Sequence, residues 1–145
     1  MEEIKNQESI LGNDIIIDAR ETFNVKDKSG NLLGRFSFDP SDIDLPRRFE
    51  KVMNYFSNLE IPQNDDLSKL YEATDEFKRQ INEALNSEDA ADALFCSNPF
   101  SPMNDGSLLA EKVLNAVAGI IEAKTNARIQ KVNKRYMEYT KKYHK

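Results

Sequence analysis

The chain has 145 residues, of which 31% are charged and 39% hydrophobic, a length that matches one domain with a modest core. No run approaches the 18 apolar residues of a membrane span, and a single cysteine cannot form an internal disulfide. The first residues, Met1–Lys5, also lack the basic start and apolar core of a secretion signal. Composition therefore argues against membrane-spanning and disulfide-scaffold classes and predicts a protein of a reducing cytoplasm.

The net charge of −5 hides a strong asymmetry along the chain. Residues 1–122 carry 12 Lys/Arg and 24 Asp/Glu, whereas residues 123–145 carry 8 Lys/Arg and one acidic residue, Glu138. An acidic body with a basic tail favours self-association into a homo-oligomer or contact with a charged partner. A solvated helix end explains the same pattern, because cations complement the helix dipole there.

Residues 1–40 contain the only β-like patterns of the chain. Residues 1–14 are polar without a clear period, and we expect a flexible leader. In the region 15–40, the apolar run Ile15–Ile17 fits a strand or a docking segment, and two alternating patterns then flank the turn Asp27–Asn31. This predicts a β-hairpin that packs on a helix, since a lone hairpin is marginally stable. Its alternating apolar residues are Phe23, Val25, Phe36 and Phe38.

Residues 41–106 are predicted to be helical, beginning with a helix that ends near Asn58. Two N-terminal signals compete for its start: Asp39 followed by Pro40, and Asp44 with Pro46 two residues later. A second helix should run from about Asp66 to Asn86, and a short helix over 89–95 should precede a loop over 97–106. Helical spacing predicts buried faces formed by Leu45, Phe49, Val52, Met53 and Phe56 in the first helix and by Leu67, Leu70, Tyr71, Phe77, Ile81 and Leu85 in the second.

Residues 107–145 predict one long C-terminal helix with a basic tail. They contain no proline and only one glycine, Gly119, and a helix of about 36 residues would span roughly 55 Å, more than a compact domain of this size can cover. The core-facing stripe is predicted at Leu109, Val113, Val117, Ile120 and Ile121. Beyond this stripe the apolar residues follow a heptad spacing. The heptad is too short for a coiled-coil assignment, but its apolar face predicts contact with a partner. The predicted partner-binding residues are Ile129, Val132, Tyr136, Tyr139 and Tyr143 of this heptad, together with Phe100 of the preceding loop.

No residue pattern indicates catalysis, a cofactor or a metal. His144 and Cys96 lack catalytic neighbours, and we expect a solvated tail residue and a buried or half-buried thiol. Asp39, Asp42 and Asp44 are better explained as helix-cap and turn residues than as metal ligands. The turn Asp27–Asn31 lacks the ligand spacing of a calcium loop. The sequence therefore predicts a protein that is not an enzyme.

Nucleic-acid binding is a further reading of the tail. Its basic residues alternate with tyrosines, a combination that can hold a nucleic-acid backbone. The acidic remainder would repel phosphate, however, and no nucleic-acid-binding fold is recognisable. Protein contact is therefore the preferred reading.

Residues 23–60 resemble the tail assembly chaperones of tailed bacteriophages, or prophages, of Gram-positive bacteria. The resemblance follows a pattern V-x-D-x-x-G-N-x-L-G-x-F-x-F-x-P-x-D and then D-x-x-x-R-F/Y-E. A second block over 81–100 has I-N-x-x-L and A-D-x-L-F, although Cys96–Pro99 replaces the glycine-rich loop usual in the family. The two blocks cover about half of the chain. The first pattern is carried by Val25, Asp27, Gly30, Asn31, Leu33, Gly34, Phe36, Phe38, Pro40, Asp42, Asp44, Arg48, Phe49 and Glu50.

The resemblance implies a non-enzymatic protein of the bacterial host cytoplasm. Such chaperones coat the tape measure protein until tail tube subunits polymerise around it, so the implied partners are the tape measure protein and the tail tube protein. We expect a mainly α (α+β) fold of three to four helices, with a small N-terminal β-hairpin and a long C-terminal helix. The alternatives are a structural head–tail connector or tail completion protein, and a small nucleic-acid-binding or regulatory protein.

Overall fold

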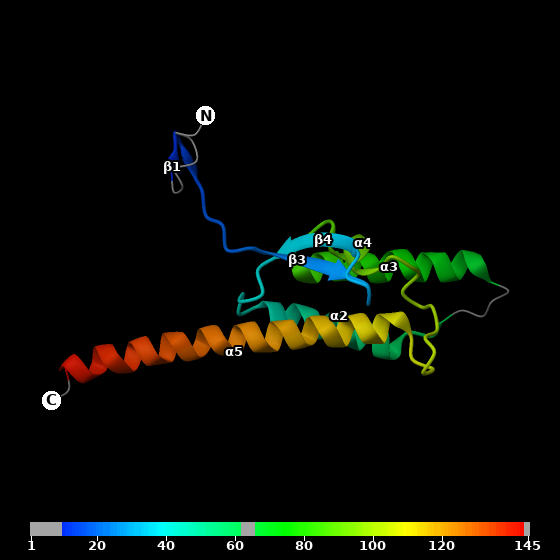
Figure 1. Cartoon of the computed structure of the whole chain (residues 1–145). Coiled ribbons are helices and arrows are strands. Elements are labelled where there is room, and N and C mark those ends of the chain that lie inside the picture. The colour runs from blue at the N-terminus through cyan, green and yellow to red at the C-terminus, as the bar shows by residue number, and fades with distance from the viewer. Residues whose placement is uncertain (1–9, 62–65, 144–145) are drawn as a thin grey trace.

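The computed structural model describes residues 10–61 and 66–143 and confirms the mainly helical fold with a small hairpin. Figure 1 shows the hairpin and three helices gathered along one part of a long C-terminal helix. In chain order the elements are β1 (Ile10–Leu11), β2 (Asp14–Ile15), β3 (Glu21–Lys26), β4 (Leu32–Phe38), α2 (Leu45–Asn58), α3 (Leu67–Leu85), α4 (Ala90–Leu94) and α5 (Leu109–Tyr143).

The predicted hairpin is present, with β3 and β4 antiparallel and Glu21 opposite Phe38. Its turn is held by the Asp27 carboxylate, which accepts hydrogen bonds from the backbone N–H groups of Ser29 and Asn31, both at 2.9 Å. The hydrogen bonds from Asn31 are the main cause that lowers the pKa of Asp27. Gly30 has φ +87°, a left-handed conformation that favours glycine. Asp27 and Gly30 are therefore turn residues, as predicted.

The helix starts and stops follow the predicted signals closely. The second of the two predicted starts is the observed one: α2 begins at Leu45, with Asp44 at the N-cap position and a proline in its first turn, although the Asp44 side chain makes no capping hydrogen bond. Helix α3 is capped by Asp66, which accepts a hydrogen bond from the backbone of Lys69; it ends at Leu85, and its C-cap residue Asn86 has the left-handed conformation. Short α4 and the loop before α5 also occur where they were predicted.

Two predicted core residues of α3 are on the surface. Leu67 and Tyr71 are 50% and 56% exposed, whereas Phe77, Ile81 and Leu85 are buried as predicted. The first turns of α3 extend past the hairpin and α4, as Figure 1 shows, so the apolar face there has little to pack against. Helical periodicity gives the face of a helix but not how far its neighbours reach.

The core is one cluster of aromatic and aliphatic side chains between the hairpin and the helices. Phe77 lies at its centre, with ring centroids 5.5 Å from Phe56, 6.0 Å from Phe95 and 5.6 Å from Phe100. The hairpin adds a second group of rings, with Phe36 and Phe38 stacked at 5.6 Å. Aromatic rings at these spacings supply most of the apolar area that a small core needs.

Strand β4 approaches α4 so closely that Gly34, at the point of contact on β4, has no room for a side chain. A Cβ atom built on Gly34 would lie 2.5 Å from the carbonyl oxygen and 2.7 Å from the Cα of Ala93. Both atoms belong to the backbone, so no side-chain rotation relieves the contact. Gly34 thereby fixes the distance between hairpin and helix.

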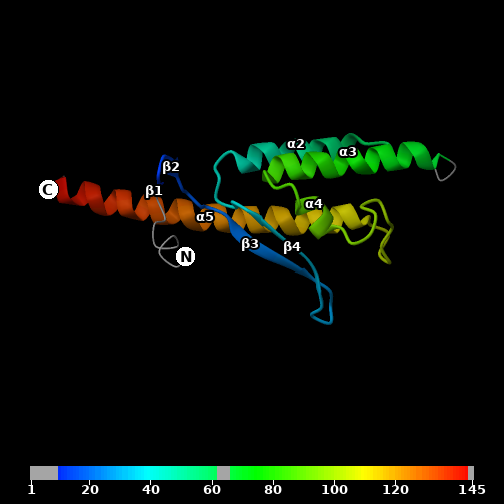
Figure 2. The ribbon, with the colours of Figure 1, turned by 90° about the horizontal axis from the view of Figure 1, so that it is seen from above.

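Helix α5 runs alongside α2, and the hairpin, α3 and α4 lie together on one side of these two helices, as Figure 1 and the view from above in Figure 2 show. Its buried residues are Ala110, Leu114, Val117 and Ile121, spaced as one helical stripe. The predicted stripe was right at Val117 and Ile121, whereas Leu109, Val113 and Ile120 are only partly buried at its edges. The contact face is thus rotated slightly from the predicted one, because it includes Ala110 and Leu114, which were not predicted to be buried.

The N-terminal arm differs from the predicted leader. Residues 10–15 form a two-strand ladder with Ile10 opposite Ile15, and Gly12 at φ +61° makes its turn. Residues 1–9 lie outside the described part of the chain. In Figure 1 the arm extends away from the body, and Ile15 and Ile17 are 76% and 84% exposed.

Candidate partner-binding surface

Helix α5 is fastened to the body by polar contacts around residues 124–128. The Thr125 hydroxyl donates to the Pro40 carbonyl at 3.0 Å, and the Arg128 guanidinium donates to the Ser41 hydroxyl at 2.8 Å. Lys124 and Arg128 also form ion pairs with the two carboxylate oxygens of Glu21, at 3.2 and 3.1 Å. These contacts join α5 to the start of β3 and to the segment between β4 and α2.

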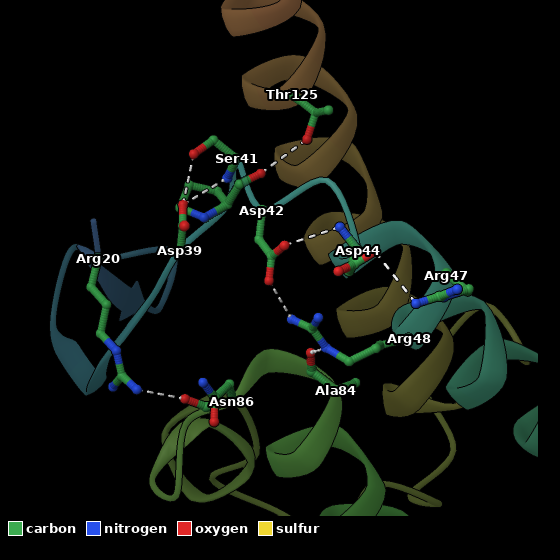
Figure 3. A network of polar contacts seen from close by, with 11 residues as sticks. Arg20, Asp39, Ser41, Asp42, Asp44, Arg47, Arg48, Ala84, Asn86 and Thr125 are labelled. Carbon is green, nitrogen blue, oxygen red and sulfur yellow. Dashed lines mark hydrogen bonds and ion pairs between the residues drawn. The ribbon is translucent and has the colours of Figure 1, made fainter. Parts of the chain in front are cut away.

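The segment between β4 and α2 is itself tied to the end of α3 (Figure 3). Arg48 donates to the carbonyl of Ala84 and to the Asp42 carboxylate, both at 2.9 Å. Arg20 donates to the Asn86 carbonyl at 2.8 Å. Cationic side chains satisfy the free carbonyls at the C-terminus of α3 and complement its dipole. These contacts of Arg20 and Arg48 hold in place the segment to which α5 is bonded.

Asp42 and Asp39 accept hydrogen bonds from residues two positions along the chain, as the prediction of turn residues requires. The Asp42 carboxylate accepts a hydrogen bond from the backbone of Asp44, which is the main cause that lowers the pKa of Asp42, with a further contribution from Arg48. Asp39 similarly accepts from the backbone and hydroxyl of Ser41. Among the described residues, no three of His, Cys, Asp and Glu come together as a metal-binding group.

Beyond Arg128 the helix runs past the body. Within the described residues, Figures 1 and 2 show no element alongside the C-terminal part of α5, since the arm that overlaps it in Figure 2 lies well away in Figure 1. Residues 129–143 extend α5 by about 22 Å at the usual helical rise. The predicted partner-binding residues Ile129, Val132, Tyr136, Tyr139 and Tyr143 belong to this overhang, and their side chains lie outside what the structure describes.

The sixth predicted partner-binding residue, Phe100, lies in the core. It is 7% exposed and packs against Phe77. A ring in that position cannot touch a partner while the core remains packed, so it is left out of the candidate surface. Cys96 shows the reverse outcome: its thiol is exposed, not buried or half-buried as predicted. His144 lies outside the described residues.

An apolar groove of about 370 Å³ follows the line where α2 and α5 meet. Among its lining residues Phe49 and Ile121 are buried, Met53 and Ala118 are half-buried, and Pro46 is exposed. Two exposed acidic residues, Glu50 on α2 and Glu122 on α5, stand at its rim. Sequence reasoning missed this groove, because it depends on which faces of two distant helices meet. The acidic residues beside apolar helix positions were its only visible signal.

Neither the protein-family models, nor the curated proteins, nor the solved structures give a match to this chain. None of the helices in residues 10–61 and 66–143 combines the length and apolar character that a bilayer crossing requires.

Proposed function

We propose that this protein is a tail assembly chaperone, a non-enzymatic binding module that holds the tape measure protein in the host cytoplasm before the tail tube forms around it. The observation that supports the proposal is the overhang of α5 over residues 129–143, on a base fixed by Glu21, Pro40 and Ser41. One motif residue of the resemblance, Pro40, contacts α5 directly, and two others, Asp42 and Arg48, tie the same segment to the end of α3.

The physical reason is that a short overhanging helix gains little from its own chain. Isolated helices of about 12–15 residues are marginal in water, and most helical stability in proteins comes from packing an apolar face. The heptad of Ile129, Val132, Tyr136, Tyr139 and Tyr143 supplies such a face, with lysines and arginines around it. An elongated helical client would cover that face by helix-to-helix packing.

The test is co-expression with a tape measure protein from the same genome, followed by pull-down and measurement of soluble tape measure protein. The double variant Tyr136→Glu/Tyr139→Glu places two charges on the heptad face and should reduce recovery of the client severalfold. The matched control is Ala123→Glu/Ala127→Glu, which adds the same charge at exposed positions of the same helix outside the heptad. Circular dichroism should show that both variants keep the helical content of the wild type.

Wild-type recovery with the tyrosine variant would show that the heptad face is not the client surface. Mass spectrometry of purified virions provides the second test, because an assembly chaperone is absent from the finished particle. Its presence there in stoichiometric amount would favour the structural alternative, a head–tail connector or tail completion protein.

A further inference from the structure

The groove between α2 and α5 has apolar and acidic lining residues that a basic amphipathic helix would complement. Its buried lining is apolar, through Phe49 and Ile121, and its rim is acidic, through Glu50 and Glu122. Neither rim carboxylate forms an ion pair with a described residue. We infer that the groove receives the basic overhang of α5 from a second copy, and that the two copies lie antiparallel with each overhang in the groove of the other.

The acidic rim of the groove favours a basic occupant, and the charge distribution along α5 favours an antiparallel pair. Residues 123–145 carry 8 Lys/Arg and one Glu, and Lys131 and Lys134 of the overhang are exposed. An antiparallel pair of α5 helices places these cations beside Glu50 and Glu122, whereas a parallel pair would set one basic tail against the other. The exposed arm is a poorer occupant, because Asp14 and Asp18 flank its isoleucines and would face the acidic rim.

The helical register agrees with this arrangement. The α5 wall of the groove runs from Ala118 to Asn126, about 12 Å along the helix axis. In an antiparallel pair with Ile129 of one copy opposite Thr125 of the other, Val132 falls opposite Glu122 and Tyr136 opposite Ala118. The first half of the heptad therefore spans the groove. Because the same contact forms twice about a two-fold axis, the pair closes as a dimer instead of growing into a filament.

The second copy would cover Val132 and Tyr136 of the heptad that the proposed function assigns to the client, so the two would compete for this face. The inference is therefore tested on the protein alone. Light scattering and sedimentation equilibrium should give a concentration-dependent mass that approaches twice the 16.6 kDa of one chain. The dimer should weaken as salt rises from about 50 mM to about 500 mM, since exposed charge pairs are screened. A monomer at every concentration and salt would overturn the inference.

Charge exchange tests the groove itself. Glu50→Lys/Glu122→Lys should raise the dimer dissociation constant at least tenfold, and adding Lys131→Glu/Lys134→Glu to the same chain should restore much of the loss. The control Glu72→Lys reverses an exposed helical carboxylate on α3, outside the groove, and should have little effect. Equal losses from the rim variant and the control, or no restoration by the exchanged pair, would refute the groove as the contact surface.

Crosslinking tests the direction and register. In a Cys96→Ser background, the pair Ala118→Cys/Tyr136→Cys should be joined between copies by a short bis-maleimide. Within one chain these positions are about 27 Å apart on a helix, too far for that reagent. Ala118→Cys alone should not crosslink, because the two copies of residue 118 are equally far apart in the antiparallel pair. Efficient crosslinking of the single variant, or none of the pair in a dimeric sample, would refute the arrangement.

Discussion

Replacing Gly34 by alanine should destabilise the fold because of one backbone contact between β4 and α4. The new Cβ would lie 2.5 Å from the Ala93 carbonyl oxygen, about 0.9 Å closer than the 3.4 Å at which ordinary contact begins. Ala90 and Ala91 beside it are fully buried, so α4 has little room to retreat. Overpacking of this kind costs about 1–3 kcal/mol, of which the lower entropy of the unfolded alanine chain offsets up to about 1 kcal/mol.

The same substitution in α5 supplies the control. Gly119 is exposed within the helix, and a methyl group added there would have no neighbouring atom within 4 Å, so Gly119→Ala should stabilise the protein by about 0.5–1 kcal/mol. Urea unfolding followed by far-ultraviolet circular dichroism suits both variants, because the chain contains no tryptophan. Equal stability of Gly34→Ala and the wild type would refute the close-approach argument, as would a similar loss for Gly119→Ala.

Two further predictions concern the network at the end of α3. Arg48→Ala should lower the free energy of unfolding by about 1–3 kcal/mol, because the Ala84 carbonyl loses its partner, and Arg48→Lys should lose less; equal stability of all three proteins in urea unfolding would contradict this. For Asp42, the native pKa lies below the ordinary value of 3.8, so the ionised carboxylate stabilises the fold above about pH 4 and that contribution disappears as pH falls through the native pKa. The stability difference between wild type and Asp42→Asn should therefore shrink in acid, and a difference that grows below about pH 4 would show that the sign is wrong.

Local chemistry made much of this fold predictable. The alternation around Asp27–Asn31, the start of α3 near Asp66 and the period of the α2 face each involve residues close in sequence, and each appears in the structure. The resemblance named Gly34 without giving a reason for it, and the reason is its approach to Ala93, 59 positions along the chain.

What escaped prediction depends on distant segments. Glu21 meets Lys124 and Arg128 across 103 and 107 positions, and no short pattern signals such a pair. The exposure of Leu67 and the burial of Phe100 likewise depend on where neighbouring elements end. The groove was missed for the same reason, since its lining residues come from α2 and α5, which are far apart in the sequence.

Because α5 is bonded to the body near Thr125 and extends beyond it, a small rotation of the helix produces a larger displacement at its C-terminal end. With a free length of about 22 Å, a rotation of 1° at the base moves the tip by about 0.4 Å, and a rotation of 10° moves it by about 4 Å. A rotation of α5 by 10° on the body would thus move the tip by about the width of a side chain, while residues near Thr125 would move much less. The direction of the overhang is set by the buried stripe of α5 together with the polar contacts to Glu21 and Pro40, and these contacts determine where its far end can meet another molecule.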